Sequence, residues 1–184
     1  MNNLLWIDVE TTGLDPTTDL VLALGMVLTD GELNIKQSIE IVFYRNPNSL
    51  VMSPYVGGMH HNSGLLERCR NSNRLFADAT YDIRRFFELA SPLGTPMDQR
   101  PYVAGSTISF DRSFMARNWP WYVEYVHYRS LDVSSLRTEI SLMRPELLQD
   151  APNKRDIHLP LADIEDSQNL LRFLRSKMWT KEAA

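Results

Sequence analysis

Two carboxylates follow a short apolar run near the start of the chain. Asp8 and Glu10 stand in the segment WIDVETTG, directly after the apolar residues 4–7. On a strand, residues two apart point to the same face, about 6.6 Å apart at roughly 3.3 Å per residue. Paired acids at the rim of a buried sheet repel each other and lose hydration, and a divalent cation between them removes both penalties. Two solvated acids at a strand end are the alternative interpretation.

Two further acids favour the metal interpretation. Asp111 follows the expected strand YVAG at the start of a helix, and Asp163 lies near the start of the last helix. Alone, Asp111 would be interpreted as a helix cap and Asp163 as an acid favoured by the helix dipole. Four carboxylates at the ends of elements predict a site for hard cations, Mg²⁺ or Mn²⁺, and the lack of clustered cysteine or histidine argues against zinc. Two such ions about 3.5 to 4 Å apart would hold the attacking and leaving oxygens of a phosphodiester.

A histidine stands close to the last of these acids. His158 precedes Asp163 by five residues, with Pro160 between them. Proline in the first helical turn places His158 on the preceding loop, from which the ring can swing over the acids. Histidine accepts protons near neutral pH, so it could take the proton of an attacking water. A histidine that closes the loop by hydrogen bonding is the alternative.

The elements that must position these residues follow from the hydrophobic pattern. Residues 4–9, 20–29 and 35–44 are expected strands, and their short links, including Asp30-Gly31, favour an antiparallel meander. Later segments are predicted as a helical region after Pro54, a helix over 76–90, a strand in PYVAGS, a helix in FDRSFMARNW, a strand in YRSLDV, a helix over 133–143 and a last helix over 161–178. This order predicts an α/β fold of the ribonuclease H type, with a mixed five-stranded sheet flanked by helices. Three antiparallel strands would come first and parallel strands would be added.

Length and charge limit the classes of function. The chain has 184 residues, of which 43% are apolar, which fits one domain over residues 1–180 with a short tail at 181–184. A net charge of −4 excludes a general polyanion binder with a broad basic face. If nucleic acid is the substrate, either bound cations offset the local acidity or the protein grips few phosphates.

The cellular compartment is predicted from cysteine usage and from the apolar segments. The single cysteine, Cys69, rules out an internal disulfide and any zinc site built from paired thiolates. The start MNNLLWIDVE has no basic stretch before a cleavable apolar segment, and the apolar run at 20–28 is too short to span a bilayer. We therefore expect a cytoplasmic protein without membrane insertion.

Three motifs, in order and suitably spaced, resemble those of the 3′-to-5′ exonucleases with four acids and a catalytic histidine, the DEDDh superfamily. They are WIDVETTGLDP, AGSTISFDRSFM and HLPLADIEDS. Over most of the chain the sequence resembles the oligoribonucleases more narrowly, through MHHNSGLLERC and above all YRSLDVSSL, which proofreading subunits lack. The resemblance implies that residues 1–180 form one exonuclease domain. It further implies that His158 is the general base and that two Mg²⁺ or Mn²⁺ ions are held by Asp8, Glu10, Asp111 and Asp163.

The resemblance also implies that the substrate-binding site is closed at one end. In that family, residues at the positions of Thr107, Arg129 and Ser134, together with His60, close around the phosphate at the far end of a dinucleotide. An arginine can fork onto such a phosphate, and the hydroxyls can donate hydrogen bonds to it. Such a cap would favour short substrates by blocking the path of longer ones. Without the resemblance, Arg129 would be interpreted as an ordinary surface residue.

Base contacts and a partner are implied in the same way. Leu14 and the aromatic ring at Tyr55 would hold the bases, and stacking on such a ring is worth about 1 to 3 kcal/mol per base. Tyr128 would come from the other subunit of a homodimer. The aromatic segment NWPWYVEYVHY suits a dimer contact, although it could equally be ordinary core. Tyr55 beside Gly57-Gly58 could likewise be a plain loop aromatic.

The sequence departs from the family pattern at several positions, none of which is an implied metal ligand. Thr11 stands where the family usually has methionine, Tyr55 where it has tryptophan, Thr107 where it has serine, and Ala162 where it has a second acid. Gly57-Gly58 and SPLGTPMDQRP also align poorly. These departures fall mainly on the base contacts and on the segments that would set the preferred substrate length.

We expect a metal-dependent exoribonuclease that releases 5′-mononucleotides from the 3′ end of very short single-stranded RNAs, including dinucleotides. One alternative is an exonuclease that acts on longer single-stranded DNA or RNA in proofreading or repair. Another is a noncatalytic subunit that binds nucleotides or a partner, against which the retention of all four acids and His158 argues. Discrimination between RNA and DNA depends on a 2′-hydroxyl contact that the sequence does not locate.

Overall fold

A computed structural model describes residues 3–178, so the expected tail at 181–184 lies outside the described residues. Its centre is a five-stranded sheet in the order β3-β2-β1-β4-β5. The first three strands pair in antiparallel fashion, and the last two run parallel to β1. The strands are β1 (Leu4–Thr11), β2 (Val21–Thr29), β3 (Ile35–Val42), β4 (Tyr102–Gly105) and β5 (Ser130–Asp132). This arrangement confirms the predicted mixed sheet.

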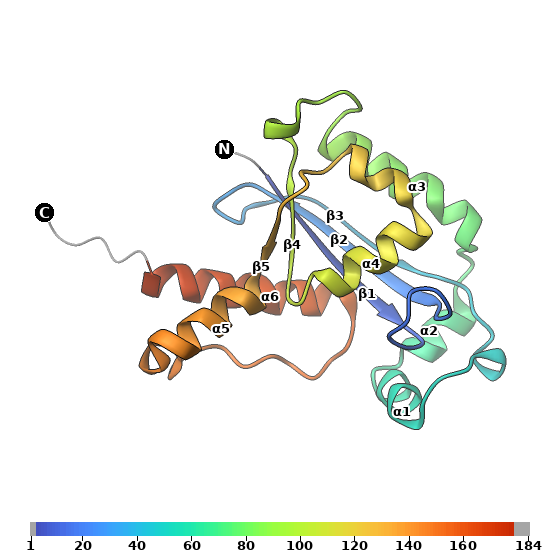
Figure 1. Ribbon diagram of the computed structural model, residues 1–184. Coiled ribbons are helices and arrows are strands. Elements are labelled where there is room, and N and C mark those ends of the chain that lie inside the picture. The colour runs from blue at the N-terminus through green and yellow to red at the C-terminus, as the bar shows by residue number, and fades with distance from the viewer. Residues whose placement is uncertain (1–2, 179–184) are drawn as a thin grey trace, which may run out of the picture.

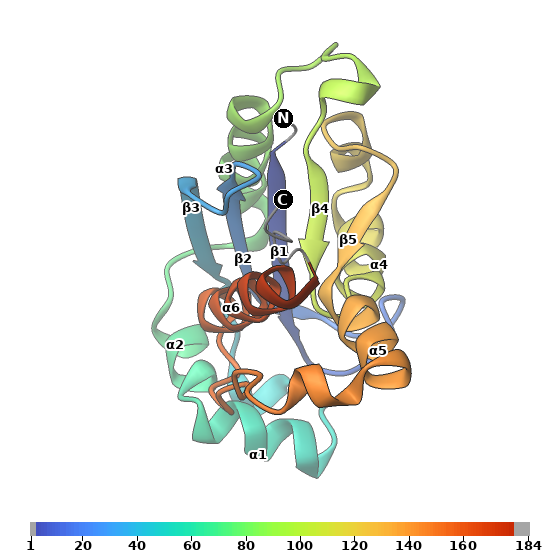
Figure 2. The same ribbon diagram turned by 90° about the vertical axis from the view of Figure 1, so that its left-hand side faces the viewer.

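Within residues 3–178, six α-helices flank the sheet. Helix α6 crosses one face, and α3 and α4 lie on the other (Figures 1 and 2). The helices are α1 (Pro54–Asn62), α2 (Leu65–Asn71), α3 (Phe76–Ala90), α4 (Ser109–Asn118), α5 (Val133–Met143) and α6 (Pro160–Met178). Short 3₁₀ helices span Pro47–Ser49, Met97–Gln99, Pro120–Glu124 and Pro145–Leu148. In the described part of the chain, no helix is long and apolar enough to cross a membrane.

Alternate side chains of β1 enter two different apolar clusters. Leu5 and Ile7 pack in the cluster that contains α3 and α4, whereas Leu4 and Trp6 pack in the cluster that contains α5 and α6. Because strand residues two apart share a face, the residues at positions 8 and 10 continue the second series. The end of β1 therefore directs Asp8 and Glu10 to the face that α6 crosses.

A glycine on β2 allows α6 to lie close to the sheet. Gly25 pairs with Asp8 across the β1–β2 ladder. A Cβ atom at Gly25 would lie 2.7 Å from the Cβ of Pro160, the first residue of α6. This close approach places the first turn of α6 beside Asp8. Helix α6 begins at Pro160, one residue before the expected start of the last helix.

Two local features add to the expected pattern. The link between β1 and β2, residues 12–20, is a loop fixed by Asp19, whose carboxylate accepts hydrogen bonds from Thr12 Oγ1 at 3.0 Å and from the Asp15 amide at 2.9 Å. Met143, the last residue of the helix expected over 133–143, is 69% exposed, so the buried face of α5 does not extend to its end. The loop matters for the site because it presents Leu14, which is 81% exposed.

Candidate active site

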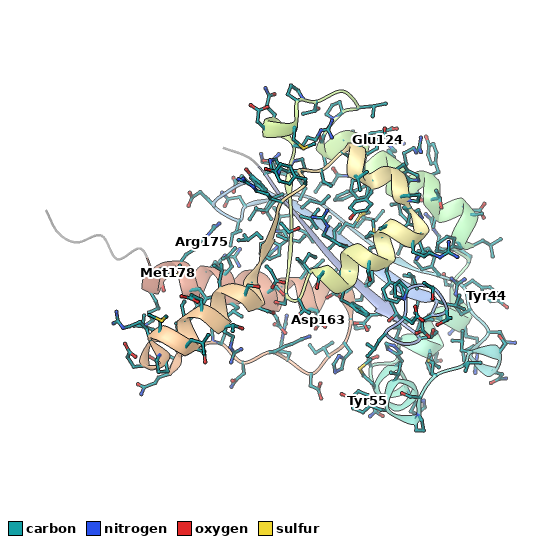
Figure 3. The ribbon with its side chains drawn as sticks, in the orientation of Figure 1. Tyr44, Tyr55, Glu124, Asp163, Arg175 and Met178 are labelled. Atoms are coloured by element: carbon teal, nitrogen blue, oxygen red, sulfur yellow. The ribbon has the colours of Figure 1, made fainter. Side chains whose placement is uncertain are left out.

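Three of the predicted acids meet where the end of β1 faces the start of α6. One carboxylate oxygen from each of Asp8, Glu10 and Asp163 lies within 4.8 Å of the others. Glu10 and Asp163 are both only 6% exposed. Figure 3 shows Asp163 at the end of α6 that lies close to β1. Buried carboxylates at this separation are costly unless positive charge or protons neutralise them, so the arrangement suits a cation.

The fourth acid lines the same cavity. Asp111 lies in the first turn of α4, and its Oδ1 accepts a hydrogen bond from the backbone amide of Val9 at 2.9 Å. A cavity of about 330 Å³ is lined by all four acids and by His158. Asp111 is thus bound to β1 at the residue between Asp8 and Glu10. Its role as a metal ligand stays a prediction.

Burial and mutual repulsion make these acids retain protons. Burial raises the pKa of Asp8 well above its usual value, and the charges of Asp111 and Glu10 add to this effect. Burial, reinforced by the charge of Asp163, raises the pKa of Glu10 to about 8. Burial likewise raises the pKa of Asp111 to about 7. Without a cation the cluster therefore holds protons near neutral pH, and a bound cation would displace them.

Lys154 also enters the cluster, and its position could not be predicted from the sequence. Its Nζ lies 2.9 Å from Oδ2 of Asp163, and it comes from the segment between α5 and α6. Burial acts to lower the pKa of Lys154, but the hydrogen bond to Asp163 and the neighbouring acids outweigh burial and raise it. The other oxygen of Asp163, Oδ1, is buried without a hydrogen-bond partner among the described residues. This unpartnered oxygen and the all-carboxylate donor set fit a hard divalent ion.

His158 lies on the loop before α6, as predicted from Pro160. Its backbone is in the left-handed region, with φ of 52°, and its ring lines the acid cavity. The ring Nε2 lies 2.5 Å from Oδ1 of Asp156. The sequence allowed two interpretations of His158, a proton acceptor beside the acids and a residue that closes its loop by hydrogen bonding. The position of the ring is compatible with both.

His60 lies against the cluster of acids. The side chain is fully buried on α1, and Nε2 lies 2.8 Å from the carbonyl oxygen of Thr11. Its Nδ1 lies 3.8 Å from Oε2 of Glu10. Burial lowers the pKa of His60. A neutral ring that donates from Nε2 would direct the Nδ1 lone pair toward Glu10, a contact that the motif MHHNSGLLERC did not reveal.

Two residues of the implied phosphate contact come together. Thr107 Oγ1 and Ser134 Oγ are 3.4 Å apart, although they belong to different segments. Both line a second cavity of about 340 Å³, which also includes Asp8, Asp163 and Arg137. The pair thus lies next to the acids, as a phosphate contact on a short substrate requires.

The remaining predicted substrate residues lie near the surface. The Arg129 guanidinium stands 5.3 Å from the ring centroid of Tyr128, which is 61% exposed. Arg129 does not line the cavity that holds Thr107 and Ser134. Tyr55, 77% exposed on α1, lines a cavity of about 640 Å³ with His158, and Figure 3 shows it at the lower edge of the molecule. Leu14 lines the acid cavity.

Comparison with known proteins places these features in a family. Residues 5–171 match the RNase_T family, described as Exonuclease. The oligoribonuclease of Nitrosomonas europaea is 36% identical over 181 residues, which cover 97% of this chain and 96% of that protein. The oligoribonuclease of Pseudomonas syringae pv. tomato is 37% identical over 175 residues, or 94% of each chain.

Solved structures show the same fold at low sequence identity. E. coli exonuclease I in complex with a dT13 oligonucleotide superposes with a TM-score of 0.69 at 14% identity. Exonuclease I from Methylocaldum szegediense gives a TM-score of 0.67 at 18% identity. These matches cover 96% and 98% of this chain but only 41% and 42% of the exonuclease I chains. The likeness establishes the ribonuclease H-like exonuclease fold.

Proposed function

Because the chain belongs to the oligoribonuclease family of exonucleases, we propose that it hydrolyses very short single-stranded RNAs, down to dinucleotides, to 5′-mononucleotides from the 3′ end. The observation that carries this proposal is the single cavity lined by four acids and His158, beside the Thr107–Ser134 pair. The acids and His158 support phosphodiester hydrolysis. The Thr107–Ser134 pair supports recognition of a terminal phosphate nearby.

Asp8, Glu10, Asp111 and Asp163 would hold two divalent ions, Mg²⁺ or Mn²⁺. When bound, such ions offset the acids and lower the barrier for water to attack phosphorus. The buried, unpartnered Oδ1 of Asp163 and the raised pKa values of Asp8 and Glu10 support this assignment. Two ions would contribute four positive charges against four carboxylates. The acidic chain could then bind an anionic substrate without a broad basic face.

His158 would accept the proton of the attacking water. To accept it through Nε2, His158 must first break its hydrogen bond with the carboxylate of Asp156. The Asp156 side chain is 94% exposed, so packing does not hold this pair together. Asp111 stays fixed by its bond to the Val9 amide, so movement of His158 need not disturb that acid. Proton transfer of this kind contributes about 10²- to 10⁴-fold to the rate.

The preference for short substrates would come from contacts at both ends. Thr107 and Ser134 can donate hydrogen bonds to a terminal phosphate, and Arg129 can add charge to it. His60 lines neither the acid cavity nor the cavity of Thr107 and Ser134, so its part in this contact would be indirect, through the backbone of Thr11. Exposed Leu14 and Tyr55 offer apolar surface to the bases. A substrate longer than the distance between these contacts would lose some of them.

We further propose a homodimer in which Tyr128 reaches the site of the neighbouring subunit. Tyr128 and Val123 are 61% and 49% exposed, and both lie in or next to the aromatic segment before β5. Large exposed apolar side chains in one segment suit a subunit contact. A cytoplasmic location is part of the same proposal, and the buried thiol of Cys69 is compatible with it.

Hydrolysis of an end-labelled dinucleotide and of a twenty-nucleotide single strand, with Mg²⁺ and then with Mn²⁺, tests the proposal. We expect kcat/KM to be at least about tenfold higher for the dinucleotide, equivalent to about 1.4 kcal/mol in transition-state binding. A preference for the longer strand would indicate a proofreading or repair type of exonuclease. No hydrolysis of either substrate with either ion would indicate a noncatalytic binding subunit.

A further inference from the structure

We propose that Asp132 is a positioning residue, which holds Thr107 and Ser134 in the arrangement that binds a terminal phosphate. This inference rests on the proposed function and assigns a role to a residue that touches neither the acids nor the reacting atoms. Asp132 is the last residue of β5, directly before α5.

The carboxylate of Asp132 joins two segments that are distant in sequence. Its Oδ1 accepts hydrogen bonds from the Thr107 amide at 3.1 Å and from the Ser134 and Ser135 amides at 2.9 and 3.3 Å. Its Oδ2 accepts a bond from the Ile108 amide at 3.2 Å. One side chain thus caps the first turn of α5 and also holds the turn that leads into α4.

The turn at Thr107 needs such a restraint. Thr107 has φ of 56°, in the left-handed region that a β-branched residue rarely adopts. Backbone strain of this kind costs about 1 to 3 kcal/mol and persists only when the surroundings hold the residue in place. Asp132 bonds the amides of Thr107 and of the next residue, Ile108, and so restrains the backbone on both sides of the strained position.

This restraint determines where the two hydroxyls lie. With both backbones bound to Asp132, Thr107 Oγ1 and Ser134 Oγ are 3.4 Å apart on the wall of the cavity beside the acids. Two hydroxyls at this distance can donate to oxygens of one phosphate. Arg137 lines the same cavity one turn further along α5, and it forms no ion pair with any residue from 3 to 178.

Asp111, one of the four proposed metal ligands, has a separate anchor. Asp111 follows this turn in α4, but its carboxylate is bound to the Val9 amide of β1. Loss of the Asp132 bonds is therefore expected to disturb phosphate binding more than the chemical step. A change at Asp132 should raise KM for substrates that carry the terminal phosphate and should alter kcat much less.

Three variants separate geometry from charge. Asp132→Asn keeps the shape and one acceptor oxygen but turns a donor toward the Ile108 amide. Asp132→Glu keeps the charge, but its longer side chain cannot keep the same four bonds. Glu139→Gln is the matched control, because it removes an exposed acid from the same helix, α5.

The experiment measures kcat and KM for a dinucleotide with and without a 5′-terminal phosphate, together with a thermal melt of each variant. For Asp132→Asn and Asp132→Glu we expect KM for the phosphorylated dinucleotide to rise at least about tenfold, with kcat within about threefold. KM for the unphosphorylated dinucleotide should change by less than about threefold, and Glu139→Gln should match the wild type. An equal loss on both substrates, or an unchanged KM, would overturn the proposal.

A double-mutant cycle with Thr107→Val keeps the test valid if one Asp132 variant folds poorly. Thr107→Val removes the hydroxyl and keeps the shape, so it should also raise KM for the phosphorylated substrate alone. If Asp132 acts through Thr107, the effects of Asp132→Asn and Thr107→Val will be less than additive in free energy. Additive effects would contradict the proposed role. If the wild type itself does not distinguish the two substrates, the terminal-phosphate contact of the proposed function fails, and the role of Asp132 fails with it.

Discussion

The ammonium of Lys154 lies 2.9 Å from Oδ2 of Asp163, within the group of acids that the sequence assigns to metal ions. The carboxylates thus receive one positive charge from the chain itself. A divalent ion would carry twice that charge and would compete with Lys154 for the same oxygens.

Removal of this ammonium should strengthen metal binding. For Lys154→Met we expect the Kd for Mn²⁺, measured by calorimetric titration, to fall by about threefold to tenfold, because the ion no longer displaces a salt bridge. The melting temperature in chelator should fall, since the acids lose their only close lysine among the described residues, and Mn²⁺ should restore it. Lys36→Met, which removes an exposed lysine bonded to Asn3, is the control. Weaker Mn²⁺ binding by Lys154→Met would show that Lys154 supports the metal.

The raised pKa values of Glu10 and Asp111 predict how stability depends on pH. In the folded protein these pKa values are about 8 and about 7, against 4.5 and 3.8 for free side chains. The folded state therefore binds more protons, and its stability in chelator should fall as the pH rises from about 5 to about 8. The rise in melting temperature caused by Mn²⁺ should grow over the same range. Glu10→Gln should flatten this slope, and a Mn²⁺ effect independent of pH would contradict the account.

Replacement of the proposed general base should affect the chemical step. For His158→Ala we expect kcat to fall about 10²- to 10⁴-fold with a much smaller change in KM, because the ring is assigned to proton transfer. His61→Ala is the matched control, since His61 is exposed on α1. Steady-state kinetics on a dinucleotide provide the measurement. An increase in KM with unchanged kcat would instead assign His158 to substrate binding.

Arg129 should matter mainly for the shortest substrates. Arg129→Ala is expected to lower kcat/KM for a dinucleotide by about tenfold to a hundredfold and to have little effect on a twenty-nucleotide strand. Arg117→Ala, at an exposed position on α4, is the control. An equal loss on both substrates would count against a role at the end of a short substrate.

The sequence predicts most of the site because local periodicity places those residues. The two-residue period of β1 directs Asp8 and Glu10 to one face, and Pro160 marks the start of α6, which puts His158 on a loop and Asp163 in the first turn. These features depend on residues that are close together in the sequence, so they can be inferred from the sequence alone.

Lys154 and Asp132 could not be predicted in the same way. Lys154 reaches Asp163 from an irregular segment, and Asp132 bonds an amide 25 residues away along the chain. No spacing rule specifies such contacts, because they depend on how separate elements pack. The conformation of the loop at 12–20 could not be predicted either, because it is held by the side chain of Asp19.

The most direct test compares the wild type with Asp163→Ala in the hydrolysis of a dinucleotide with Mg²⁺ or Mn²⁺, with circular dichroism to verify the fold. Asp163 provides both the contact with Lys154 and the buried, unpartnered oxygen. We predict that the wild type releases 5′-mononucleotides only when a divalent ion is present, and that Asp163→Ala stays folded with a rate at least about a thousandfold lower, equivalent to about 4 kcal/mol. Full activity of Asp163→Ala, or equal hydrolysis by the wild type in chelator, would contradict the central claim that these acids form a metal-dependent nuclease site.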